Sequence, residues 1–107
     1  MSEAFAVQKY DNTGGEIAYT VTRFAAAGET PLVKGMVGKA EPLRAIAILI
    51  LRDLGEYPTV EQADELVRLE LASLNERPYG VQIVSAARVR RWIEARERAL
   101  EGRVSEA

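Results

Sequence analysis

The chain has 107 residues, of which 48% are hydrophobic and 28% charged, and its formal net charge at neutral pH is −2. This size and composition are typical of one folded domain, residues 1–107, and exclude wholesale disorder. Because the chain holds no cysteine and no histidine, it excludes a disulfide framework, a Cys or His metal site, a thiol nucleophile and a Ser-His-Asp triad.

The N-terminal third predicts a small antiparallel sheet. Apolar and polar residues alternate over about residues 4–10 and 16–23, and a period of two predicts strands. The segment DNTGG between them favours a hairpin loop, because Asp, Asn and Gly accept the backbone angles of tight turns. Residues 25–30 are interpreted as a connector. Residues 32–37 are a candidate third strand, in which Gly35 indicates a bulge or a close backbone approach.

Residues 42–54, PLRAIAILILRDL, are the most apolar segment and predict a helix. Pro42 suits its first position, and Gly55 suits the left-handed residue after its last turn. Apolar residues lie on all sides of this helix, so it must be covered all round. We expect the sheet to cover one side and two further helices the other, which makes Ile48 essential for folding. A homodimer that covers part of the helix is the alternative.

Two amphipathic helices are expected after the central one, over about residues 60–74 and 86–101. Thr59 and Gln62 have the spacing of a capping box at the start of the first. Trp92 lies on the apolar stripe of the second, which we expect Gly102 to end, with a frayed end at residues 103–107. The segment VQIV, residues 81–84, is a candidate short strand. Strands followed by helices predict an α+β fold, a small antiparallel sheet packed on the central helix.

Charge is distributed unevenly over these two helices. Residues 56–76 contain six acids and one base, whereas residues 85–107 contain six arginines and four glutamates. Complementary, solvated faces of neighbouring helices are the simplest interpretation. The alternative is a nucleic-acid-associated regulator that uses Arg88, Arg91 and Arg98, which share one side of the last helix. A helix-turn-helix is excluded, because residues 75–84 are too long for its turn of about four residues.

No group of residues in this sequence has the pattern of a catalytic, cofactor or metal site. We therefore expect a non-catalytic protein-protein interaction domain without cofactors, such as a small inhibitor of the anti-defence (anti-CRISPR-like) kind or an adaptor. Eleven arginines against three lysines suggest a bacterial or phage source. A cytoplasmic location is expected, since no cysteine is used and the longest apolar run, residues 45–51, is too short to cross a membrane. The candidate partner-binding residues are Arg88, Arg91, Arg98, Glu61, Glu65, Thr20 and Thr22.

Overall fold

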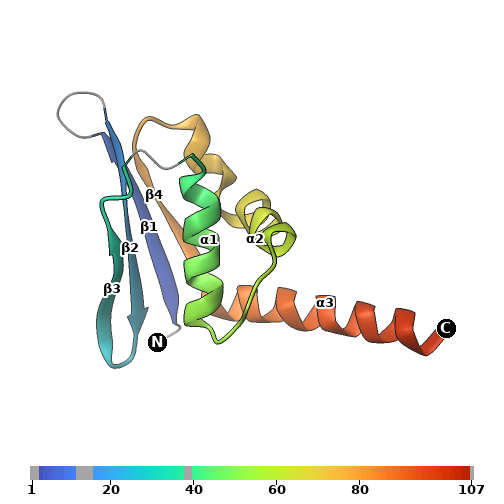
Figure 1. Ribbon diagram of the computed structural model, residues 1–107. Coiled ribbons are helices and arrows are strands. Elements are labelled where there is room, and N and C mark those ends of the chain that lie inside the picture. The colour runs from blue at the N-terminus through green and yellow to red at the C-terminus, as the bar shows by residue number, and fades with distance from the viewer. Residues whose placement is uncertain (1–2, 12–15, 38–39, 107) are drawn as a thin grey trace.

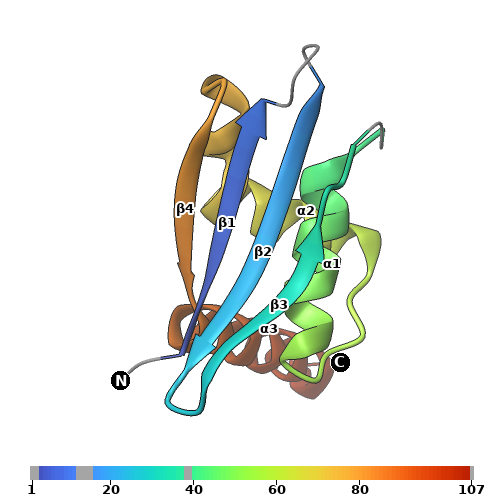
Figure 2. The same ribbon diagram turned by 90° about the vertical axis from the view of Figure 1, so that its left-hand side faces the viewer.

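The computed structural model describes residues 3–11, 16–37 and 40–106. Four strands form one antiparallel sheet in the order β3-β2-β1-β4, and the helices lie on one face of it (Figures 1 and 2). The strands are β1 (Ala4–Asp11), β2 (Ile17–Ala25), β3 (Gly28–Lys34) and β4 (Gly80–Ser85). The helices are α1 (Pro42–Asp53), α2 (Val60–Leu66) and α3 (Ala86–Glu106). The predicted α+β class is confirmed.

β1 lies in the interior of the sheet, between β2 and β4. It therefore brings the N-terminal strands beside β4, which comes late in the chain. It pairs with β2, where Val7 lies opposite Val21, and with β4, where Phe5 lies opposite Val84. These four side chains are fully buried and point toward the helices. The candidate strand at residues 81–84 is therefore confirmed as part of β4. Residues 12–15 of the expected hairpin loop lie outside the described residues.

The predicted bounds of the third strand are wrong, because β3 starts four residues earlier than expected and ends at Lys34. Only residues 26 and 27 form the turn between β2 and β3, so most of the expected connector belongs to strands. Pro31 lies within β3. A proline is tolerated there because β3 is an edge strand, on which an N–H group can be lost without breaking a ladder.

Gly35 lies directly after β3, and the close backbone approach that the sequence indicates is wrong, because a Cβ at this position would have no atom within 4 Å. The position favours glycine for its φ of 80°, and its N–H donates to the Tyr19 carbonyl at 2.9 Å. The irregularity in the ladder lies elsewhere. The register between β2 and β3 shifts between Val21 and Thr22.

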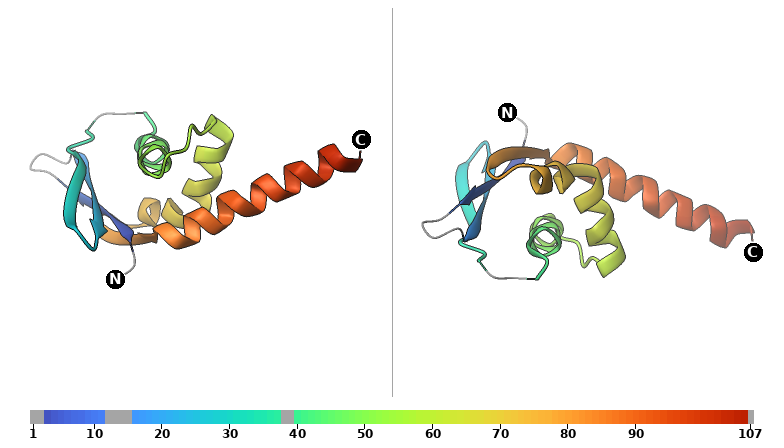
Figure 3. Two further views of the ribbon diagram at one scale, coloured as in Figure 1. Left: turned by 90° about the horizontal axis from the view of Figure 1, so that it is seen from below. Right: turned by 90° about the horizontal axis from the view of Figure 1, so that it is seen from above.

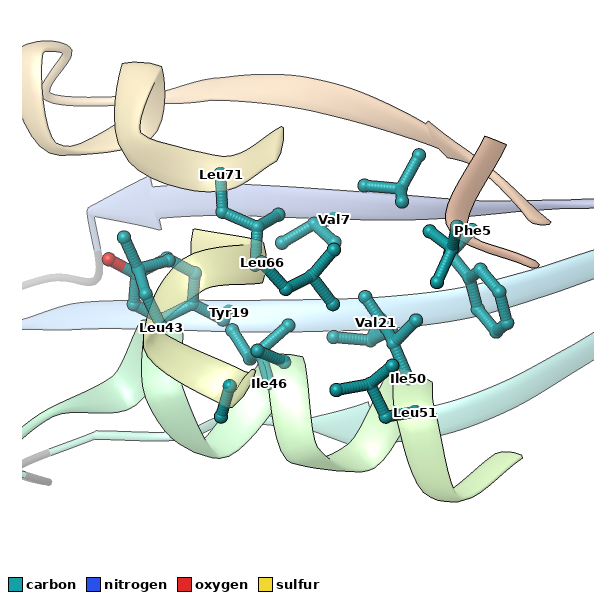
Figure 4. Close-up of a cluster of buried hydrophobic side chains, with 14 of the residues drawn as sticks. Phe5, Val7, Tyr19, Val21, Leu43, Ile46, Ile50, Leu51, Leu66 and Leu71 are labelled. Atoms are coloured by element: carbon teal, nitrogen blue, oxygen red, sulfur yellow. The ribbon is translucent and has the colours of Figure 1, made fainter. Parts of the chain in front are cut away.

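α1 lies against the inner face of the sheet and supplies much of the core (Figure 4). Its buried residues are Leu43, Ile46, Ala47, Ile50 and Leu51. The expectation that α1 is covered all round is wrong, because Ala45, Ile48 and Leu49 are only partly buried. The reason is visible in Figure 3, where α2 lies beside α1 but α3 runs away from it.

The predicted second helix has three helical geometries in succession. After α2 come a π-helical turn, η1 (Val67–Leu71), and a 3₁₀ turn, η2 (Ala72–Glu76). Leu66, Leu71 and Leu74 are buried in the core. Their spacings of five and three residues match one wide and one tight turn, so the change of pitch keeps all three leucines inward.

The capping box at the start of α2 is confirmed. Gln62 donates its N–H to Thr59 Oγ1 at 3.2 Å, and Thr59 donates its N–H to Gln62 Oε1 at 2.8 Å.

α3 projects from the body of the molecule (Figures 1 and 3). Ala86 and Val89 are buried, and Trp92 packs partly buried against the core. The expected end at Gly102 is wrong, because the helix continues to Glu106. A glycine inside a helix costs only about 1 kcal/mol relative to alanine and does not by itself stop it. No helix in the described ranges has a stretch long and apolar enough to cross a membrane.

Candidate functional site

The face of the sheet that points away from the helices is not covered by any other element in the described residues. Because side chains alternate between the two faces of a strand, the residues between the buried ones of β1, β2 and β4 point outward. We call this set the open sheet face; Figure 2 looks onto it. Its members are Ala4, Ala6, Gln8, Tyr10, Thr20, Thr22, Phe24, Val81, Ile83 and Ser85, together with Ala18, which lies on this face but is fully buried.

On β1, β2 and β4 the open sheet face carries no charged side chain, although 28% of the chain is charged; on the edge strand β3, exposed Glu29 and Lys34 lie beside it, opposite Phe24 and Thr20. Val81 and Ile83 are 50% and 55% exposed, and Tyr10 and Phe24 are partly exposed. A sheet with one face in water usually alternates apolar inward with polar outward residues. Val81 and Ile83 are therefore apolar at outward positions where a polar residue is usual.

A hollow of about 420 Å³ lies where β1 ends beside the start of β4. Its lining residues are Gln8, Lys9, Tyr10, Tyr79, Gly80 and Val81. Tyr79 is 70% exposed. Lys9 is only 6% exposed, and its Nζ donates to the Leu74 carbonyl at 2.8 Å. The lysine thus helps to hold η2 against the sheet, and the two tyrosines give the hollow an aromatic rim.

Two of the predicted partner-binding residues, Thr20 and Thr22, belong to the open sheet face, where they are partly buried in β2. Glu61 is exposed in the first turn of α2. Arg91 is exposed on α3, and Arg98 donates from Nε to the Glu94 carbonyl of its own helix at 3.4 Å. The predicted residues therefore lie on three separate surfaces and do not form one site.

The remaining two predicted residues bind within the chain. Arg88 pairs with Glu70 through two contacts, Nε to Oε1 at 2.7 Å and Nη2 to Oε2 at 3.0 Å. Glu65 binds Arg96 of α3 and lies 3.7 Å from Arg68. These contacts agree with the interpretation of complementary helix faces, since they join the acidic segment to the basic one.

A second cleft, of about 250 Å³, lies between the start of α1 and α2. Here Arg44 binds Asp64 through both carboxylate oxygens, at 2.7 and 2.9 Å, and Glu41 at 2.6 Å. The hydrogen bond from Arg44 holds the pKa of the Asp64 carboxyl below its usual value, and the same bond raises the pKa of Arg44. Because these groups are paired with one another, their arrangement serves to hold α1 against α2.

The described side chains contain no cluster of three acidic residues that could hold a metal ion. Burial raises the pKa of the Tyr19 hydroxyl on the inner face, which keeps this phenol protonated.

Sequence reasoning missed the apolar members of the open sheet face. The alternation in VQIV places Val81 and Ile83 on one side of a strand, but it does not show that this side is outward. Which side of β4 faces outward is determined by its pairing with β1, a segment about 75 residues away in the chain.

Comparison with known proteins adds no relative. No family model matches the chain, and neither a curated protein nor a solved structure matches it.

Proposed function

We propose that this chain is a non-catalytic protein-binding domain, a small phage or bacterial inhibitor or adaptor of the cytoplasm, which binds its target through the open sheet face. The observation that supports the proposal is the uncharged, partly apolar surface that β1, β2 and β4 turn toward solvent. Contiguous apolar patches on soluble domains mark interaction surfaces. The centres of protein interfaces are likewise poor in charge and rich in aromatic side chains.

The backbone beneath this surface suits it to binding. β1 is paired on both sides, and its inward residues Phe5 and Val7 are fully buried. The backbone of such a strand is already ordered before a partner binds, which lowers the entropic cost of association. Tyr10 and Phe24 provide aromatic anchors at either end of the face.

The helical surfaces support partner binding less well. Arg88 and Glu65 are already engaged inside the chain, so a ligand would have to compete for them. The same argument weakens the nucleic-acid alternative, because phosphate binding needs free cations and Arg88 is held by Glu70.

The test compares variants on the three surfaces in affinity capture from the native host. Thr22→Arg and Thr20→Arg place a charge on the open sheet face, while Glu61→Arg and Arg91→Glu change exposed charges on α2 and α3. We expect the wild-type chain and both helix variants to form a stoichiometric complex with a protein, and both threonine variants to lose it. Circular dichroism confirms the fold of each variant. The proposal would be contradicted if both threonine variants still captured the protein while Arg91→Glu did not. It would also be contradicted if the wild-type chain captured only nucleic acid.

A further inference from the structure

The two edges of the sheet differ in how well they are protected against pairing with another strand. β3, at one edge, carries Pro31, two charged residues opposite β2 (Glu29 and Lys34) and a register shift. Proline, charge and irregular register are the features by which proteins prevent edge-to-edge association. β4, at the other edge, has the sequence GVQIVS and a regular register with β1, so it lacks all three.

The main-chain groups of Val81 and Ile83 face the open edge. The Ala86 N–H donates to the Glu3 carbonyl at 3.1 Å, which makes these two residues a hydrogen-bonded pair. In an antiparallel ladder hydrogen-bonded pairs alternate with non-bonded ones. Gln82 and Val84 therefore bond to β1, whereas the N–H and C=O groups of Val81 and Ile83 point away from it.

We infer that β4 pairs with β4 of a second copy of this chain, antiparallel, so that two sheets become one. This contact does not depend on the proposed function, because it uses the main chain of an edge and requires no target protein. Antiparallel pairing about a twofold axis normal to the sheet keeps both sets of helices on one side. The two open sheet faces then form one continuous surface.

The sequence of β4 is self-complementary in this arrangement. With Gln82 opposite its own copy, Val81 of each strand lies opposite Ile83 of the other as a hydrogen-bonded pair. This register makes about four main-chain hydrogen bonds and sets four apolar side chains in a row.

Charge also favours a second copy as the occupant. The six residues of β4 are uncharged, so two chains of net charge −2 bring no like charges together along the strand. Arg88, near the start of α3, is already paired with Glu70 of its own chain, so pairing of the two strands does not draw on it. The guanidinium group of Arg77 lies against Gly80, the first residue of β4 in the same chain. α3 leaves β4 on the helix side of the sheet (Figure 1).

The test measures molar mass by sedimentation equilibrium from micromolar to millimolar concentration. We expect a monomer–dimer equilibrium in the wild-type chain. Ile83→Lys should raise the dimer dissociation constant at least about tenfold, because the twofold axis introduces one charge into each of the two apolar Val81–Ile83 pairs. Thr22→Lys, on the same face but away from the edge, should leave it unchanged. A monomer throughout, or a dimer that both lysine variants leave intact, would overturn the inference.

A second measurement does not depend on the stability of a variant. Amide hydrogen exchange by NMR should show slow exchange at Gln82 and Val84 at every concentration. The amides of Val81 and Ile83 should exchange rapidly in dilute solution and become protected as the dimer forms. Protection of these two amides in the monomer, or continued rapid exchange in a dimer, would contradict edge pairing. Thr22→Arg should abolish target capture and leave the dimer intact, so this variant distinguishes failure of the proposed function from failure of the strand pairing.

Discussion

Single side chains hold the ends of the helical segments to their neighbours. Thr59 and Gln62 satisfy each other's backbone at the start of α2. Ser85 accepts a hydrogen bond from the Arg88 N–H at the start of α3, at 3.3 Å. At the other end of the helical segment, Lys9 binds the Leu74 carbonyl from inside the molecule. Helix ends leave backbone groups unpaired, so these contacts decide where each helix begins and ends.

Thr59→Ala removes the hydroxyl that accepts the Gln62 N–H. We expect the free energy of unfolding to fall by about 1 kcal/mol, the usual cost of losing such a cap. Urea denaturation followed by circular dichroism measures the change. Thr59→Ser keeps the hydroxyl and should restore most of the stability; equal losses in both variants would show that the cap contributes little.

The Arg44–Asp64 pair predicts a contribution to stability that depends on pH. Since the pKa of Asp64 is lowered in the folded chain, its carboxylate stabilises the fold above the ordinary carboxyl pKa of about 3.9. The contribution is lost as the pH falls through the folded-state pKa. Asp64→Asn should therefore lower the urea midpoint at neutral pH, and the difference from wild type should shrink on acidification. Glu61→Gln, at an exposed position on the same helix, is the control. A difference that stays constant with pH would contradict this role.

At the scale of elements, the features that the sequence predicts correctly are those that depend on residues close together in the chain. The capping box, the helix start at Pro42 and the alternation of β1 and β2 all depend on neighbouring residues, and each is found in the structure. The bounds of β3 could not be predicted in this way, because Pro31 is tolerated only where β3 is an edge strand. The π and 3₁₀ turns after α2 likewise depend on core contacts of Leu71 and Leu74.

The same limit applies to the candidate site. Alternation places Thr20 and Thr22 on one side of β2, but only the pairing of β1 with both neighbours brings them to the same face as Ile83. Glu65 and Arg88 look like free charges in the sequence. Their partners, Arg96 and Glu70, lie 31 and 18 residues away.

Two isoleucines of α1 differ in their burial. Substituting each of them tests which sides of the helix are covered by the rest of the molecule. Ile50 is fully buried, whereas Ile48 is only partly buried. Ile50→Ala should lower the free energy of unfolding by about 2–5 kcal/mol, because it leaves a cavity in the core. Ile48→Ala should cost about 1 kcal/mol, since less apolar surface returns to water. Urea denaturation of both variants checks this order; a larger loss at Ile48 would place the core on the other side of α1.

At the scale of the whole molecule, the helices lie on only one face of the sheet, and α3 extends away from it within overall dimensions of 56 × 33 × 20 Å. The charged residues join helices to one another at Arg44–Asp64, Arg88–Glu70 and Arg96–Glu65. On the opposite face of the sheet, the part formed by β1, β2 and β4 is uncharged and partly apolar, and β3 adds Glu29 and Lys34 at one edge. This division between a charged helical layer and the uncharged surface of β1, β2 and β4 is the central feature of the molecule, and the proposed binding function follows from it.

Hydroxyl-radical footprinting of the chain, alone and in complex with its captured protein, tests that division most directly. Tyr10, Phe24 and Ile83 report on the open sheet face, and Tyr57, which is 90% exposed between α1 and α2, reports on the helical layer. The account predicts that oxidation of the first three side chains falls on binding while that of Tyr57 is unchanged. Protection of Tyr57 with no change at Tyr10, Phe24 and Ile83 would contradict it.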